Sequence, residues 1–190
     1  VESLAFHPSK QLLATCSRDG TARLFDFNGQ MLRVFTGHTA DVLSIVWDKN
    51  GEYLVTSSDD GTIKHWNPET GQLVNDLHVG SIETDTIVIG ADGTVYAGND
   101  AGEIIIIKDQ ERRQISAHLA GIKSLVYDHR LGLLMSLSYD QSCKIWEMKP
   151  RFQCQREVNF PALIWPRSAA FFSDEKIVFG TFGSAYGTFN

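Results

Sequence analysis

Apolar side chains along this chain fall into short runs that are separated by turn-forming residues. In the best-defined segment these runs lie over residues 42–47, 53–57, 62–66 and 72–77. The first run is apolar enough for a strand buried on both faces, and the last is more polar, as in an edge strand. Asn, Asp and Gly between the runs are typical of hairpin turns. No stretch has a sustained helical period, so the pattern predicts an all-β unit of four short strands.

The same unit recurs along the chain. Residues 19–25 read DGTARLF, residues 60–66 read DGTIKHW, and residues 140–146 read DQSCKIW. A repeat of about forty residues means that one supersecondary unit is used several times. A third copy is degenerate, with Ile107 in the place of Trp66, and a last copy has Phe189 there.

Alignment of the copies divides the chain into five units. We expect them at residues 1–36, 37–77, 78–117, 118–158 and 159–190. Each unit would bury its apolar face against its neighbours, so function is expected on the shared surface of the array. Val1 aligns with the middle of a unit, and Asn190 follows the third strand of the last one. We therefore expect the sequence to be a piece of a larger array whose last unit lacks its outer strand.

Gly37 and His38 ahead of one unit, together with the DGTxKxW run at its third strand, resemble the WD-repeat family of β-propellers over essentially the whole chain. The resemblance implies four-stranded blades around a central channel. It implies about five blades here, the last one incomplete, in a parent ring of seven. A ring of five blades, completed by residues preceding Val1, is the alternative. Asn67 and Glu147 depart from the family, which usually has Asp there.

The resemblance also implies a buried hydrogen-bonded tetrad in the two most complete units. Its members would be His38, Thr56, Asp60 and Trp66 in one unit and His118, Ser136, Asp140 and Trp146 in the other. A buried indole N–H needs an acceptor, and a hydroxyl can accept and donate at once. A His between a hydroxyl and a carboxylate then satisfies every member. The first unit keeps only Thr15 and Asp19, with Phe25 in place of the indole.

A His, a hydroxyl and an Asp are also the members of a hydrolytic triad. Here the set occurs twice at repeat positions and each copy ends in a Trp, whereas a nucleophile needs an open pocket and oxyanion donors. There is no G-x-S-x-G elbow. We expect no catalytic residue, cofactor or metal. The alternative is a propeller hydrolase or lyase with chemistry at the channel mouth, where Asp41, Asp59 and Asp100 could supply oxygen ligands to a hard cation.

Composition narrows the classes of partner. The formal net charge is −6 and the basic residues are scattered, which disfavours nucleic-acid or anionic-ligand binding, although that class stays an alternative. Three cysteines without paired spacing fit a reducing intracellular compartment such as the cytoplasm. No apolar run approaches the roughly 20 residues of a membrane span, and the start has no signal-peptide pattern.

One end of the units is the expected binding surface. We call it the top face; it carries the loops of His38 and Asp60. The partner-binding candidates are Arg18, Thr39, Asp41, Asp59, Leu119, Tyr139, Phe160, Trp165 and Arg167. The last three belong to residues 159–167, where two prolines replace the Gly-His loop. Alternatively these are ordinary loop side chains, with Trp165 packed between units.

These observations favour a non-catalytic scaffold that presents its top-face loops to other proteins, as a subunit of a larger complex. Arg and Tyr in such loops are frequent interface anchors. Open strand edges also allow self-association or completion by another chain.

Overall fold

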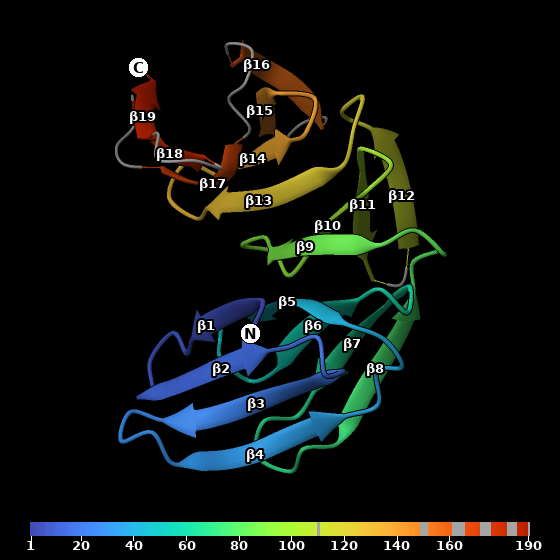
Figure 1. Cartoon of the computed structure of the whole chain (residues 1–190), viewed down its shortest axis with the longest axis vertical. Coiled ribbons are helices and arrows are strands. Elements are labelled where there is room, and N and C mark those ends of the chain that lie inside the picture. Colours follow the sequence, from blue (N-terminus) through green and yellow to red (C-terminus); the bar gives the residue numbers. More distant parts are fainter. Residues whose placement is uncertain (110, 149–151, 161–165, 172–175, 182–185, 190) are drawn as a thin grey trace. The chain divides into compact units, whose positions relative to one another are not determined.

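The computed structural model describes residues 1–109, 111–148, 152–160, 166–171, 176–181 and 186–189. These residues form nineteen β-strands (Figure 1). The part of the chain described in this way contains no helix that is long and apolar enough to cross a membrane. The chain divides into two compact units, Val1–Gly93 and Thr94–Asn190.

The first unit contains two complete sheets of four antiparallel strands. Their orders are β1-β2-β3-β4 and β5-β6-β7-β8. The strands are β1 (Ser3–Phe6), β2 (Leu12–Cys16), β3 (Thr21–Asp26), β4 (Met31–Thr36), β5 (Val42–Trp47), β6 (Leu54–Ser58), β7 (Thr62–Trp66) and β8 (Leu73–His78). A further strand, β9 (Thr84–Ile89), lies against β5 and β6.

The second unit continues the same architecture. The sheet that begins with β9 has the order β9-β10-β11-β12, the next has the order β13-β14-β15-β16, and the last has three strands, β17-β18-β19. The strands are β10 (Val95–Asn99), β11 (Glu103–Lys108), β12 (Glu111–Ser116), β13 (Ile122–Asp128), β14 (Leu133–Ser138), β15 (Ser142–Glu147), β16 (Gln153–Asn159), β17 (Pro166–Phe171), β18 (Ile177–Thr181) and β19 (Tyr186–Phe189). Five antiparallel sheets in series, the last of them incomplete, confirm the predicted all-β blade architecture.

The repeat is also a repeat of strand register. Thr15 pairs with Leu4 on one side and with Arg23 on the other. Thr56 pairs in the same way with Ile45 and Lys64. Equivalent positions of the repeat therefore lie at the same place in their sheets.

Turn chemistry fixes this register. The amide of Gly51 donates to the carbonyl of Asp48 over 3.0 Å, and the amide of Tyr53 donates to Oδ1 of Asp48 over 2.7 Å. Gly51 has a φ of +74°, which favours glycine. The strands of this segment begin and end within one residue of the predicted positions.

Each unit has its own apolar core between sheets. In the first unit, small side chains of the first sheet, such as Ala14 and Ala22, pack with Ile45, Trp47 and Leu54 of the second. In the second unit the core contains Met135, Leu137, Cys143, Phe160 and Phe179. The outer strands β8 and β12 are mostly exposed, which agrees with their polar sequences.

Candidate functional site

The second sheet brings His38, Thr56, Asp60 and Trp66 into one hydrogen-bonded chain. Nε1 of Trp66 donates to Oγ1 of Thr56 over 2.9 Å. Nε2 of His38 lies 2.7 Å from the same oxygen, and Nδ1 of His38 lies 2.8 Å from Oδ2 of Asp60. Since Asp60 only accepts, the consistent assignment has the Thr56 hydroxyl donating to Nε2 and the Nδ1–H donating to the carboxylate.

The fourth sheet repeats this chain with Ser in place of Thr. Nε1 of Trp146 donates to Oγ of Ser136 over 2.8 Å, and Nε2 of His118 lies 2.7 Å from that oxygen. Nδ1 of His118 is 3.0 Å from Oδ2 of Asp140. The two networks, whose members are 80 residues apart in sequence, thus have the same hydrogen-bond partners at similar distances.

Burial and hydrogen bonding set the charge states of the network. Burial alone would raise the pKa of Asp60, but hydrogen bonds from the Thr62 hydroxyl, the Thr39 amide and His38 outweigh it and bring the pKa to about 2. Asp140 has the same balance, with Ser142 and Leu119 as donors, and its pKa is also about 2. Burial lowers the pKa of His38 and His118 below the ordinary value, even though each faces a carboxylate. The networks therefore hold neutral imidazoles against ionised carboxylates at neutral pH.

The first sheet holds only part of such a network. Oδ2 of Asp19, the oxygen that would receive a His, accepts a hydrogen bond from the guanidinium of Arg23 instead. Oδ1 of Asp19 accepts the amide and hydroxyl of Thr21, as Oδ1 of Asp60 does from Thr62. The turn at Asp19 therefore has the same hydrogen bonds as the turn at Asp60, although among the described residues no His contacts Asp19.

The networks also fix the backbone of the top-face loops. The amide of Thr39 donates to Oδ2 of Asp60 over 3.0 Å, and the amide of Leu119 donates to Oδ2 of Asp140 over 3.0 Å. Leu119 nevertheless has a side chain that is 97% exposed. A large apolar side chain is thus presented to solvent by a backbone that the buried network holds in place.

Tyr139 lies next to this loop on the second unit. Its amide donates to the carbonyl of Gly121, and its ring is exposed. Nζ of Lys123 lies 4.8 Å from the ring centroid, within range of a cation–π interaction, and also donates to Asp100 over 2.9 Å. Sequence reasoning selected Tyr139 but missed Lys123, which the repeat does not distinguish from other strand residues.

Arg18, a partner-binding candidate of the first unit, lies among carboxylates. Arg18 is exposed; its Nε donates to Glu2 over 2.9 Å and is 3.8 Å from Asp41. The hydrogen bond and charge of Glu2, with further contributions from Asp41 and Asp59, raise the pKa of Arg18. Thr39 is exposed, whereas Asp41 and Asp59 are half-buried. Asp59, a partner-binding candidate, has one of its carboxylate oxygens buried.

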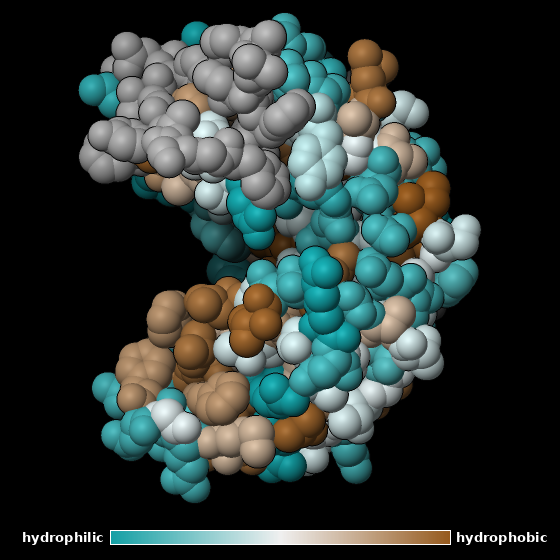
Figure 2. Space-filling model, in the orientation of Figure 1, coloured by the Kyte–Doolittle hydropathy of each residue, from teal (hydrophilic) through white to brown (hydrophobic). Residues whose placement is uncertain are grey.

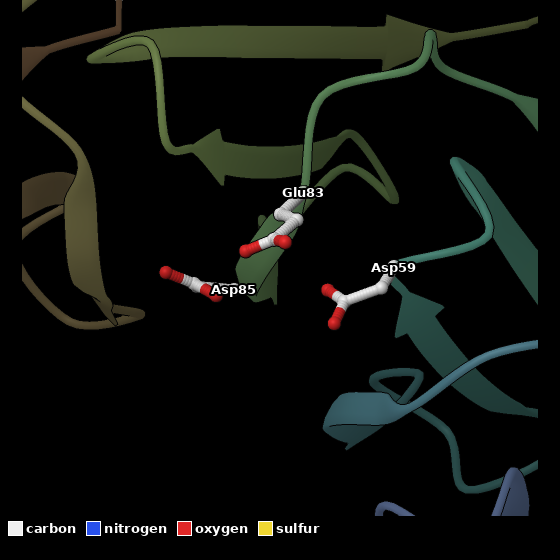
Figure 3. Close-up of side chains that lie close together, drawn as sticks. All are labelled: Asp59, Glu83 and Asp85. Atoms are coloured by element: carbon white, nitrogen blue, oxygen red, sulfur yellow. The ribbon is translucent and has the colours of Figure 1, made fainter.

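Asp59 also belongs to a group of three carboxylates (Figure 3). One oxygen from each of Asp59, Glu83 and Asp85 lies within 4.8 Å of the other two. The sequence alternative combined Asp59 with Asp41 and Asp100, but Asp100 is paired with Lys123. Exposed acidic groups of this kind are common in proteins that bind no metal, and we assign none here.

In the segment that replaces the Gly-His loop, Phe160 is buried and not exposed as predicted. This residue was a candidate anchor for a partner, but its side chain is only 6% exposed. Its ring packs against Phe179 with centroids 4.8 Å apart, so Phe160 belongs to the core. Arg167 is exposed, as expected of a surface residue. The candidate Trp165 lies outside the described residues.

The hydroxyls of the two networks are not available to a substrate. Thr56 and Ser136 are completely buried. Each accepts the indole N–H of a Trp from one side and contacts a His on the other. An attacking oxygen needs an open approach to the substrate, so this geometry does not form a hydrolytic triad.

Comparison with known sequences defines the class of protein. The family model described as "WD domain, G-beta repeat" matches residues 1–26, 29–67 and 109–147, which together make up more than half of the chain. The chain therefore belongs to the WD40 family.

Individual relatives share about a quarter to a third of the aligned residues with the chain. The chain is 26% identical over 147 residues to the transcriptional corepressor LEUNIG_HOMOLOG of Arabidopsis thaliana, a match that covers 75% of the chain and 19% of that protein. It is 29% identical over 126 residues to the COMPASS component SWD3 of Saccharomyces cerevisiae, covering 66% of the chain and 38% of that protein. It is 31% identical over 107 residues to the target of rapamycin complex subunit wat1 of Schizosaccharomyces pombe, covering 55% of the chain and 34% of that protein. The chain thus spans well under half of the length of each of these relatives.

Proposed function

We propose that this chain is a non-catalytic protein-interaction scaffold that binds other proteins through its top-face loops, as a subunit of a larger complex. The observation that carries the proposal is Leu119, whose side chain is almost fully exposed on a loop held by Asp140. Because the backbone that carries Leu119 is already ordered, binding at this loop loses little backbone conformational entropy. Tyr139 and Arg18 add an aromatic and a guanidinium group of the kinds enriched at binding hot spots.

The relatives support the same class of function. Their names describe a transcriptional corepressor, a COMPASS component and a target of rapamycin complex subunit. The last two names describe parts of protein assemblies. The free cysteines, of which two are buried, agree with a reducing intracellular compartment.

Two other classes have less support. An enzyme of the triad type would need an exposed hydroxyl, and both network hydroxyls are buried. A nucleic-acid-binding surface needs free basic groups, but Arg18 is already bonded to Glu2 and lies beside Asp41.

Site-specific photo-crosslinking tests the proposed surface directly. Benzoylphenylalanine is placed at position 119 in cells that express the chain in its natural protein, and crosslinked proteins are identified by mass spectrometry. The matched control is position 73 on outer strand β8, because Leu73 is also an exposed leucine. We expect defined protein adducts from position 119 that position 73 does not give.

A substitution completes the test. Leu119→Asp should remove these partners from affinity-purified complexes, while Leu73→Asp should leave them in place and both variants should unfold at similar temperatures. Adducts that are the same at both positions, or complexes that keep their composition in Leu119→Asp, would show that the top face is not the binding surface.

A further inference from the structure

The chain contains two Asn-Gly pairs, Asn28-Gly29 and Asn50-Gly51. In such a pair the amide nitrogen of the glycine can attack the side-chain carbonyl carbon of the asparagine, because glycine has no side chain that hinders the approach. The glycine nitrogen loses its proton to water, a succinimide ring forms, and the side-chain nitrogen leaves with a proton as ammonia. Water then opens the ring to aspartate or isoaspartate. The reaction consumes an amide and a water and needs no oxidant or enzyme.

The two pairs lie in turns of the same local construction. The amide of Gly29 donates to the carbonyl of Asp26 over 3.1 Å. The amide of Gly51 donates in the same way to the carbonyl of Asp48 over 3.0 Å. The amide of each asparagine donates to a carboxylate oxygen of the same aspartate. In both turns the glycine amide must leave its hydrogen bond before its nitrogen can attack, so the local structure favours neither pair.

The turn that carries Asn28, between β3 and β4, is open to solvent. Asn28 and Gly29 are both exposed. Within the described part of the chain, apart from the two chain neighbours, a Cβ at position 29 would meet no atom within 4 Å. Figure 2 shows teal, hydrophilic side chains at the edge of the first unit where Figure 1 places this turn. Packing among the described residues therefore does not oppose the opening of this turn at its glycine.

His7 holds the turn of Asn50 closed. A Cβ at the buried position 51 would lie 2.3 Å from Nε2 of His7. Nδ1 of His7 accepts the amides of Ser9 and Lys10 over 3.0 and 2.9 Å, so the ring proton is on Nε2, which donates to the carbonyl of Gly51 over 3.2 Å. The ring also packs edge-on against the indole of Trp47. The turn of Asn50 can open only when its contact with this fixed ring breaks.

We propose that Asn28 is a site of spontaneous deamidation in the folded protein, and that the contact with His7 protects Asn50 from the same reaction. The modification acts on the turn of Asp26. Nδ2 of Asn28 donates to Oδ2 of Asp26 over 3.3 Å, and the product places a second carboxylate there instead. Isoaspartate also lengthens the backbone ahead of Gln30, whose amide donates to Oδ1 of Asp26 over 2.8 Å. Deamidation therefore weakens this end of the hairpin, independently of the proposed function.

Peptide mapping by mass spectrometry tests the site on the natural protein that contains this chain, after ageing at physiological temperature and slightly alkaline pH. We expect conversion at Asn28 to be roughly tenfold faster than at Asn50, because the second turn must also break the hydrogen bond from His7 and unpack its ring. In urea this ratio should fall, since neither turn is then held. Equal rates in the folded protein, faster conversion at Asn50, or a ratio that urea leaves unchanged would each overturn the proposal.

A variant of His7 separates the effect of the contact from that of the local sequence. His7→Ala should raise the rate at Asn50 toward that at Asn28, and the Asn28 rate in the same sample is the internal control. The matched control is His78→Ala on the outer strand β8, where the side chain is exposed; it should leave both rates unchanged. Circular dichroism and thermal unfolding establish that each variant is folded. A folded His7→Ala variant in which Asn50 stays protected would overturn the proposal, and if that variant does not fold, the comparison with and without urea decides.

Discussion

Nε1 of Trp66 donates a hydrogen bond to Oγ1 of Thr56 over 2.9 Å, and both side chains are buried beneath the first sheet. The same hydroxyl meets His38, so the indole closes a network that reaches the Asp60 turn. Phe25 is the repeat equivalent of Trp66, but it is half-exposed and lies beside no such network. Trp66 and Phe25 therefore occupy the same position of the repeat but differ in burial, so substitutions at the two positions show how much stability comes from burial.

Trp66→Ala should destabilise the chain much more than Phe25→Ala. We expect a loss of roughly 3–5 kcal/mol for Trp66→Ala, because a large cavity forms in the core, and about 1 kcal/mol for Phe25→Ala, because less apolar area is buried there. Urea unfolding followed by tryptophan fluorescence and circular dichroism measures both. Equal losses in the two variants would contradict the assignment of Trp66 to a buried network.

Gly61→Ala should be more damaging than Gly29→Ala. Both glycines have positive φ, so both changes carry a backbone cost of about 1 kcal/mol. A Cβ at position 61 would also lie 1.9 Å from the carbonyl oxygen of Gly80, whereas a Cβ at position 29 meets nothing within 4 Å. We expect a total loss of about 3 kcal/mol for Gly61→Ala, measured by denaturant unfolding; similar losses would mean that the Gly80 backbone moves away freely.

Gln141→Gly should stabilise the chain. Gln141 has a φ of +66° at the turn position where the first three sheets have Gly20, Gly61 and Gly102. Relief of this conformation should exceed the entropic cost of glycine and give about 0.5–1 kcal/mol of added stability. The control is Asp109→Gly, since Asp tolerates a positive φ better than Gln and should gain less. A gain at position 109 equal to that at position 141, or no gain at 141, would contradict this reasoning.

Acidification should destabilise the fold in two stages. The pKa values of His38 and His118 are lowered in the folded state, so unfolding takes up protons, and stability falls as the pH drops below 6.5, the ordinary value. The pKa values of Asp60 and Asp140 are about 2 instead of 3.8, so their contribution is complete above pH 3.8 and is lost as the pH falls toward 2. Unfolding free energies measured from pH 8 to pH 2 should decline in these two stages. The double variant His38→Gln with His118→Gln should lose most of the upper stage, and an unchanged upper stage would contradict the neutral-imidazole assignment.

Thiol reactivity should distinguish one cysteine from the other two. Burial raises the pKa of Cys16 and Cys143 to about 12, from an ordinary value of 9.0. Their thiolate fraction at pH 8 is then about a thousandfold lower than that of an ordinary thiol. We expect iodoacetamide to modify exposed Cys154 first and the other two only after unfolding. Rapid modification of Cys16 in the folded chain, read by peptide mass spectrometry, would contradict its burial.

The sheet architecture could be predicted from the sequence because its signals are local. A hairpin turn such as residues 48–51 is fixed by side chains within five positions of one another, and the repeat then transfers each assignment to the next unit. The two networks were predicted through the resemblance to the WD-repeat family, whose full set of His, hydroxyl, Asp and Trp occurs at equal spacing in both copies.

Burial between sheets could not be predicted in this way. The prolines that replace the Gly-His loop predict an irregular surface segment with Phe160 as an anchor, and only the packing of Phe179 against Phe160 shows that it belongs to the core. The cation alternative placed Asp41 and Asp100 beside Asp59, whereas the structure brings Glu83 and Asp85 to it; these two residues come from a degenerate unit, where the repeat gives no guide to position.

The Asp turns have a consequence for the order in which the chain folds. Asp19, Asp60 and Asp140 each accept the hydroxyl of the residue two positions later, over 2.6 Å. At Asp19 all the hydrogen bonds of this turn are present, although Arg23 and not a His contacts the second carboxylate oxygen. The turn therefore forms from contacts of the shortest sequence range, while the His contacts at Asp60 and Asp140 bridge 22 residues and carry a larger loop-closure cost. We therefore expect each hairpin to close before the His loop joins it, so that the sheets assemble from local pieces despite the long-range pairing that usually slows β-proteins.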